Sequence, residues 1–291
     1  MTTTMATTYR NLSSVIGRTN DRLNSLYLQA SSGQKLNQAS DAPASILPAL
    51  HAASQITLSD QYLKTMDTAQ QRLDTVDLHL DELDNLLTRC QEIAVAGGDG
   101  SYSDADRQTL ADEVGQLREQ LLSIANAKVD GTYLFAGFDY LDAPFSGDPV
   151  TYGGSDDHFM LEIGPGETVQ TNLTGEETFI SPVNMFDLLD TLQTALLNND
   201  TATLTATYED LDEAAEQGRR LRGQMGNINA RIESSRALME DTKLQMQENL
   251  SRYRDADIAS VATDISQAEL ALEAAMSVVA KVSELSILDY L

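Results

Sequence analysis

The strongest constraint on this sequence is the spacing of apolar residues at its two ends. One series alternates steps of four and three residues, through Met5, Tyr9, Leu12, Ile16, Thr19, Leu23, Leu26 and Ala30. A second alternates three and four, through Ile258, Val261, Ile265, Ala268, Leu272, Ala275, Val279 and Val282. Such a seven-residue repeat is typical of helices that bury one narrow stripe against other helices. Each end therefore predicts a long helix that packs on a neighbour.

Further seven-residue series lie in the central region, over residues 63–90, 110–124 and 211–253. We interpret these as helices of an ordinary bundle that pack on one another. The last of these series and the C-terminal series are out of phase, and the break falls at 251–257. A phase shift marks a change in helix packing. The turn-rich stretch that begins at Ser31-Ser32-Gly33 predicts the matching break near the N-terminus.

Turn and capping residues divide the central helices. Gly97-Gly98-Asp99-Gly100 predicts the end of a helix after Ala96. Ser103, followed three residues later by Asp106, predicts a capping box that opens the next helix, and Gly131 predicts where that helix ends.

Residues 131–181 differ in composition, because they are rich in Gly, Pro, Asp and Thr. Short alternating runs predict strands at 132–135, 150–152, 158–163 and 168–173. A short helix is predicted after them, at Phe186–Leu197.

The fold class that these patterns predict is mainly α. We expect a long helical rod, or coiled-coil bundle, formed by the N- and C-terminal regions, with a small β-rich inserted domain. Three domains are predicted: a terminal-helix assembly domain (1–40 plus 252–291), a helical rod domain (41–137 plus 182–251) and a small β-rich outer domain (138–181). Pro48 predicts that a helix either begins near it or kinks there.

The formal net charge is −26, from 45 acidic and 19 basic residues. This balance argues against nucleic acid or an anionic membrane as a partner, since both require a basic surface. Residues 1–40 carry +3 and residues 252–291 carry −4, so the acidic excess lies between them. A nearly neutral pair of terminal helices suits a buried layer, and the acidic middle suits a solvated exterior.

Targeting features are few. No apolar run approaches the roughly 20 residues that a spanning helix needs, and the first ten residues lack the apolar core of a cleaved signal peptide. With Cys90 as the single cysteine, no disulfide can form within the chain.

No residue pattern indicates catalysis. His51, His79 and His158 are scattered, and His79 with Cys90 would provide only two of the ligands that zinc needs. Asp156-Asp157-His158 is interpreted as a polar turn rather than a cation site. The stretch beginning at Asp99 lacks the glycine and glutamate positions of a calcium loop. We therefore expect no catalytic residue, no cofactor and no metal site, and predict that the protein is not an enzyme.

The candidate functional site is instead the apolar stripe of the two terminal helices, which we predict to be a self-assembly seam. We further hypothesise that both helices are largely disordered in the free monomer and fold only on assembly. The seam comprises Met5, Tyr9, Leu12, Ile16, Leu23, Leu26, Ile258, Val261, Ile265, Ala268, Leu272, Ala275, Val279 and Val282.

Several motifs resemble those of the flagellin superfamily. Ala30–Leu36 followed by Ser40–Pro43 is similar to its "SSGxRI…SDDP" stretch. Ile124–Gly137, which contains YLFAG, resembles the "ANT…G.YLF.G" motif of the family's hook–filament junction branch. The segments Asn184–Leu189 and Leu285–Leu291 also resemble that branch. The resemblance covers nearly the whole chain and is loosest across 138–181.

The resemblance implies an extracellular ring subunit at the distal end of the bacterial flagellar hook. Its implied partners are hook-associated protein 1 on the cell side, flagellin on the filament side and further copies of itself. It also implies type III export without a cleaved signal peptide, and a cytoplasmic chaperone that holds the C-terminal helix. Two alternatives stay open: a flagellin or minor flagellin of the filament, and an intracellular coiled-coil adaptor.

Overall fold

The computed structural model describes residues 2–38, 42–129 and 131–288, with side chains for residue 7 and for 9–282 within those ranges. Residues 39–41 of the predicted turn and 289–291 of the C-terminal motif lie outside the described residues. The chain divides into two units, which we call the terminal unit (1–59 with 241–291) and the central unit (60–240). Two long helices, α2 (Pro43–Gly98) and α5 (Thr201–Arg254), contribute to both.

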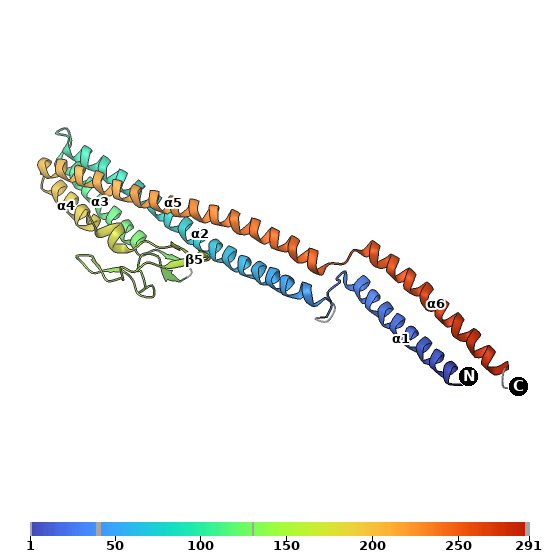
Figure 1. Ribbon diagram of the computed structural model, residues 1–291. Coiled ribbons are helices and arrows are strands. Elements are labelled where there is room, and N and C mark those ends of the chain that lie inside the picture. Colours follow the sequence, from blue (N-terminus) through green and yellow to red (C-terminus); the bar gives the residue numbers. More distant parts are fainter. Residues whose placement is uncertain (1, 39–41, 130, 289–291) are drawn as a thin grey trace. The chain divides into compact units, whose positions relative to one another are not determined.

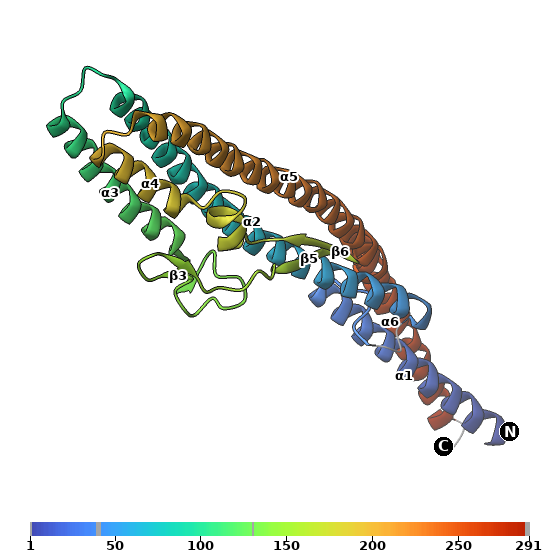
Figure 2. The same ribbon diagram turned by 90° about the vertical axis from the view of Figure 1, so that its left-hand side faces the viewer.

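In the terminal unit, α1 (Thr2–Ser32) and α6 (Ile258–Leu288) lie antiparallel, side by side (Figures 1 and 2). The helix break predicted at Ser31-Ser32-Gly33 is confirmed, since α1 ends directly before Gly33, whose φ of 70° favours glycine. The break predicted at 251–257 is also confirmed, because α5 ends at Arg254 and α6 begins at Ile258. Asp257 caps α6, since its Oδ1 accepts a 3.0 Å hydrogen bond from the Ala259 amide.

α2 begins at Pro43, so the helix starts before Pro48 and continues through it. Pro48 is the sixth residue of α2, so it removes one of the early helical hydrogen bonds without ending the helix. The same helix ends at Gly98, two residues beyond the predicted end at Ala96.

The central unit is a helical bundle in which α2, α3 (Asp104–Ala125), α4 (Met185–Leu197) and α5 share one apolar core (Figure 2). The predicted helix at 186–197 is confirmed as α4, which begins one residue earlier. The predicted seven-residue series provide part of this core, including Met66, Leu73, Leu80, Leu83 and Leu87 on α2, Val114 and Leu121 on α3, and Leu211, Met225 and Ile232 on α5. The central helices therefore bury their stripes against one another.

The predicted capping box at the start of α3 is confirmed. The Asp106 amide donates to Ser103 Oγ over 3.3 Å, and the Ser103 amide donates to Asp106 Oδ2 over 3.0 Å. These bonds satisfy two amides that the first helical turn leaves without partners.

The predicted end of α3 at Gly131 is wrong, because the helix ends at Ala125. Asn126 leaves the helix and binds strand β3 (Phe145–Ser146): its Oδ1 accepts from the Phe145 amide (3.1 Å), and its side-chain amide donates to the Phe145 carbonyl (3.0 Å). Gly131, with a φ of 82°, lies instead between strands β1 (Lys128–Val129) and β2 (Thr132–Tyr133).

The small β-rich insertion is confirmed as three two-stranded antiparallel sheets. They pair β1 (Lys128–Val129) with β2 (Thr132–Tyr133), β3 (Phe145–Ser146) with β4 (Thr151–Tyr152), and β5 (Met160–Gly164) with β6 (Glu167–Gln170). The strands are shorter than the predicted runs. A π-helical turn, η1 (Glu176–Ile180), follows them and was not predicted.

Candidate assembly surface

The seam residues predicted from the sequence lie mostly in the contact between α1 and α6. Four of them are buried in one apolar cluster, namely Leu23, Leu26, Val261 and Ala268. A second group is half-buried, comprising Leu12, Ile16, Ile265, Leu272, Ala275, Val279 and Val282. Two predicted members are not brought into the contact, since Tyr9 is 57% exposed and Ile258 is 51% exposed. The side chain of Met5 lies outside the described residues.

Polar contacts between α1 and α6 lie at the solvent edge of the pair. The Tyr27 hydroxyl donates a 2.7 Å hydrogen bond to Glu269 Oε1, and this bond raises the pKa of the tyrosine. Arg22 and Asp264 approach to 3.9 Å, with both side chains largely in solvent. Exposed ion pairs of this kind contribute little stability, so apolar packing is the main attraction between the helices.

A short backbone bridge joins the two chain segments that flank the pair. Gln34 and Asp255 pair as an isolated antiparallel bridge. The Lys35 amide donates to the Arg254 carbonyl over 2.7 Å, and the Ala256 amide donates to the Gly33 carbonyl over 2.9 Å. The bridge ties the end of α1 to the start of α6, and so fixes the register at which the two helices begin to pack.

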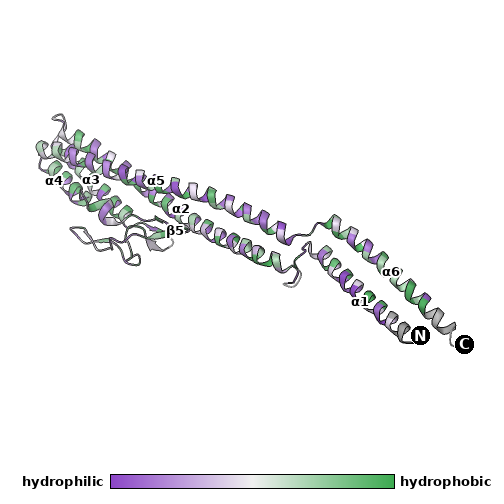
Figure 3. Ribbon diagram, in the orientation of Figure 1, coloured by the Kyte–Doolittle hydropathy of each residue, from purple (hydrophilic) through white to green (hydrophobic). Residues whose placement is uncertain are grey.

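α6 carries apolar residues beyond the face that contacts α1, and Figure 3 shows hydrophobic residues recurring along the helix. Leu270, Met276 and Val278 are all exposed. Our sequence analysis did not identify this outer face, although Leu270, Ala274 and Val278 recur at steps of four. A helix that is apolar on more than one face is usually buried on more than one side.

The YLFAG motif is part of the core of the central unit. Leu134, Phe135 and Ala136 are buried, and Phe135 packs edge-on against Phe179 with ring centroids 5.1 Å apart. Gly137 has a φ of 60°, and a Cβ there would collide with the Ser155 carbonyl. The motif therefore specifies packing and backbone geometry rather than chemistry.

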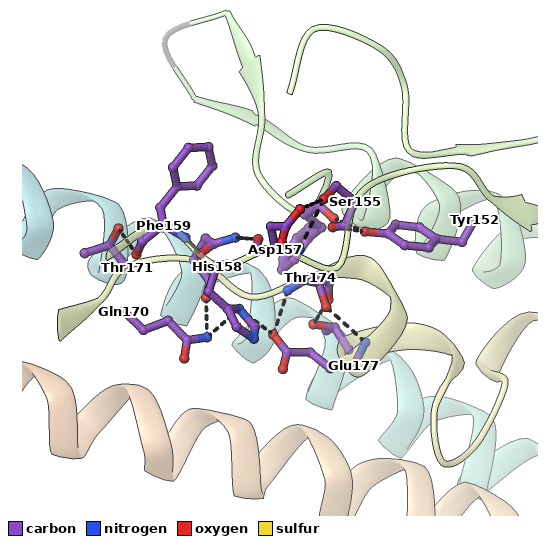
Figure 4. A network of polar contacts seen from close by, with 12 residues as sticks. Tyr152, Ser155, Asp157, His158, Phe159, Gln170, Thr171, Thr174 and Glu177 are labelled. Atoms are coloured by element: carbon purple, nitrogen blue, oxygen red, sulfur yellow. Dashed lines mark hydrogen bonds and ion pairs between the residues drawn. The ribbon is translucent and has the colours of Figure 1, made fainter. Parts of the chain in front are cut away.

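A network of polar contacts in the β-rich segment follows this motif (Figure 4). Ser155 Oγ accepts from the Asp157 amide over 3.2 Å and donates to its carboxylate over 2.6 Å, which makes a local side-chain turn. His158 Nδ1 lies 2.9 Å from the amide nitrogen of Gln170 and 3.9 Å from Glu177. Ser155 therefore binds a carboxylate and not the imidazole, so this network is not a Ser–His pair.

The remaining candidates for chemistry are separated in space. Among the described residues, no group of three or more His, Cys, Asp or Glu side chains is placed to hold a metal ion. His79 contacts Glu82 at 3.0 Å. Cys90 is fully buried, and burial raises the pKa of its thiol to about 12. No helix in the described ranges has the length and apolarity required to span a bilayer.

The fold has paired terminal helices, a helical bundle and an apolar outer surface on α6. These features define a structural subunit. Residues 4–139 match the model of the bacterial flagellin N-terminal helical region, and residues 208–291 match that of the bacterial flagellin C-terminal helical region. Together the two matches cover well over half of the chain, which belongs to the flagellin family of flagellar structural proteins.

Individual relatives agree with this assignment. Flagellar hook-associated protein 3 of Escherichia coli strain K12 is 25% identical over 271 residues, covering 84% of this chain and 86% of that protein. A flagellin of Halalkalibacterium halodurans is 24% identical over 259 residues, covering 87% and 85%. The solved structure of the flagellar junction protein FlgL from Legionella pneumophila shares the fold with a TM-score of 0.63 at 16% identity, covering 72% of this chain and 100% of that one.

Proposed function

We propose that this chain is the structural subunit that joins the bacterial flagellar hook to the flagellin filament. The observation that carries the proposal is the end-to-end similarity to hook-associated protein 3, because the match spans most of both proteins. The structure of the α1–α6 pair also supports the proposal, because the pair has a small buried cluster and further apolar residues that are exposed. Such a surface suits a subunit that is covered by neighbours on several sides.

The three predicted domains have distinct roles in this proposal. The terminal-helix domain (1–40 plus 252–291) makes the contacts of assembly, and the rod domain (41–137 plus 182–251) provides a stable body. The β-rich outer domain (138–181) covers one side of the rod, since residues such as Phe145 and Phe179 are buried in the central core. The seam residues on α1 and α6 then have two roles: they pack the two helices within one subunit, and they contact neighbouring subunits.

We further propose the partners that this position requires. Hook-associated protein 1 lies on the cell side and flagellin on the filament side, and further copies of the chain complete a ring. The chain leaves the cell through the flagellar type III apparatus without a cleaved signal peptide. A cytoplasmic chaperone holds the apolar face of α6 until export, as a groove holds an amphipathic helix.

A second candidate function is a flagellin or minor flagellin of the filament, which the 24% identity to a flagellin favours. Abundance separates the two, because a filament subunit dominates a sheared flagellar preparation whereas a junction subunit is a trace component. The intracellular coiled-coil adaptor loses its support, because it does not account for membership of the flagellin family.

Deletion of the gene tests the proposal. Electron microscopy of the deletion strain is expected to show hooks without filaments, and the medium is expected to contain unpolymerised flagellin. Expression of the intact chain from a plasmid, as the control, restores filaments. Filaments of normal length on the deletion strain would exclude the proposed function.

A further inference from the structure

Helix α5 contains a short stretch whose composition is unfavourable for a helix. Residues 223–229, with the sequence GQMGNIN, include two glycines and two asparagines. Apart from proline, glycine is the poorest helix former, and asparagine also ranks low. The rest of α5 contains one further glycine, Gly218, and one further asparagine, Asn249. Helix propensity therefore has a local minimum at residues 223–229, which we call the weak segment.

Packing within the chain does not require the two glycines of the weak segment. Beyond its own helical turn, a Cβ added at Gly223 or at Gly226 meets no atom within 4 Å. Alanine would therefore fit at both positions, and it would favour the helix. The glycines lower the local stability of α5, and no contact that a side chain would block explains them.

The weak segment also interrupts a ladder of ion pairs between α5 and α2. Aspartates lie seven residues apart on α2, and α5 carries two arginines with an asparagine between them at the same spacing: Asp67, Asp74 and Asp81 on α2, and Arg236, Asn229 and Arg222 on α5. Arg222 contacts Asp81 at 2.6 Å, and Arg236 contacts Asp67 at 2.6 Å. Asn229 therefore occupies the middle position, where a third arginine would complete the ladder.

The middle position of the ladder holds a cleft of about 190 Å³. Asp74, Gly226 and Asn229 all line it. The Oδ1 atom of Asn229 is buried and has no hydrogen-bond partner among the described residues. A buried acceptor without a donor destabilises the folded state. The weak segment thus combines poor helix propensity with incomplete packing against α2.

Both sides of the weak segment are anchored more firmly. On one side, Arg222 pairs with two aspartates of α2. On the other side, Ile232 is fully buried, and Ser235 Oγ donates a 2.9 Å hydrogen bond to Glu167 Oε2. Within the weak segment itself, Met225 is buried in the core and is the contact that local opening would break.

We propose that the weak segment is a flexible point built into the central bundle, at which α5 opens locally while the bundle on both sides of it stays folded. A stretch of low stability between two anchored stretches opens at a lower free energy than either of them. The chain can then bend at this point. The use of such bending rests on the proposed function, because a subunit between hook and filament is deformed whenever either one bends.

Native-state hydrogen exchange of the full-length chain tests the local opening. Amides of the weak segment are expected to exchange about tenfold faster, or more, than those of 208–214 and 233–239. Gly226→Ala is expected to slow exchange in the weak segment by about fivefold, because alanine favours the helix. Asn229→Arg should also slow it, since the arginine can pair with Asp74. Equal exchange in the weak segment and its flanks, or no slowing in either variant, would overturn the proposal.

Gly218→Ala is the matched control for these variants. A Cβ at Gly218 also meets no atom within 4 Å, but the residue lies outside the weak segment. This substitution should leave the exchange rate of the weak segment, relative to its flanks, unchanged. If Gly218→Ala slowed that relative rate as much as Gly226→Ala, exchange would report the stability of the whole helix, and a local flexible point would be excluded.

Filament retention tests the role of the bending. In the deletion strain, the chain with Gly223→Ala and Gly226→Ala should support filaments that break at the hook more readily under shear, whereas Gly218→Ala should behave like the parent. Equal retention in the three strains would refute a role for bending. Filaments on the deletion strain itself would refute the proposed function, and hydrogen exchange of the purified chain would still decide whether the weak segment opens.

Discussion

Tyr27 on α1 and Glu269 on α6 are joined by a 2.7 Å hydrogen bond between residues 242 positions apart in the sequence. Both side chains lie at the solvent edge of the helix pair. Beneath them, the fully buried part of the contact consists of Leu23, Leu26, Val261 and Ala268. The two helices therefore meet through a small apolar cluster and a few exposed polar contacts.

We predict that this pair opens far more readily than the central bundle. Fixing each backbone residue costs on the order of 1–2 kcal/mol, and few buried side chains offset that cost along α1 and α6. Native-state hydrogen exchange of the dilute full-length chain should show little protection at 10–30 and 258–282, and strong protection in the central helices. Equal protection in both units would contradict the hypothesis that the terminal helices order fully only on assembly.

Leu272→Asp should separate folding from assembly. Leu272 is half-buried against the small cluster of the terminal pair and makes no contribution to the central core. The thermal midpoint of the main unfolding transition is therefore expected to change little, while junction assembly is lost because a carboxylate is inserted into the seam. The checks are calorimetry and filament counts in a complemented deletion strain. Leu272→Met is the conservative control, and normal filament formation by Leu272→Asp would argue against the seam.

Arg107 should be important for the stability of the central unit. Only 8% exposed, it donates to the Gly97 carbonyl (2.8 Å), the Asp99 carbonyl (3.0 Å) and Asn199 Oδ1 (3.3 Å). Arg107→Ala leaves helix-end carbonyls of α2 without these donors, so the free energy of unfolding should fall by about 2–3 kcal/mol. Denaturant titration of the full-length chain measures this loss.

The control for Arg107 is Arg220→Ala, since Arg220 is largely exposed on α5. Its effect on the free energy of unfolding should stay within about 0.5 kcal/mol. Equal losses in the two variants would show that charge, rather than the buried hydrogen bonds, accounts for the effect.

The α3 capping box should make part of the stability depend on pH. Hydrogen bonds from Ser103 lower the pKa of Asp106 from its usual 3.8. The pKa of Asp106 is lower in the folded state than in the unfolded state. The stabilisation is therefore fully present at a pH above the unfolded-state pKa, and it is lost as pH falls through the folded-state pKa. Asp106→Asn should therefore lower the thermal midpoint at pH 7, and the difference from the parent should vanish at a pH below 3.8.

Asp142→Asn removes the same charge from an exposed loop position and serves as the control. It should not lower the thermal midpoint at pH 7. A difference between parent and Asp106→Asn that persists below the folded pKa would indicate that the capping box is not its source.

Features that depend on local spacing could be predicted from the sequence. The stripe that buries Leu83 and Leu87 on α2, and the stripe that buries Leu211 and Ile232 on α5, follow from helical periodicity alone. The Ser103 cap and the break before α6 are also local signals. The end of α3 was mispredicted because Asn126 binds a strand 19 residues away, a pairing that no local pattern reveals.

Features assembled from distant segments could not be predicted. Gln217 is 2% exposed, and its amide group donates to the carbonyls of Glu177, Thr178 and Ser181, some 36 to 40 residues away. Nothing local in the sequence marks Gln217 as buried. The apolar groove lined by Leu36, Leu50 and Leu250 is likewise built from three separated segments. The outer face of α6 was different, since the spacing of Leu270 and Val278 was visible in the sequence.

Immunogold labelling tests the central claim most directly. Antibodies against this chain, applied to intact flagella with their hooks attached, should label one narrow band at the boundary between hook and filament. A junction subunit predicts that band and unlabelled filament beyond it. Label distributed along the filament would identify a flagellin instead, and label confined to the cell body would contradict the account altogether.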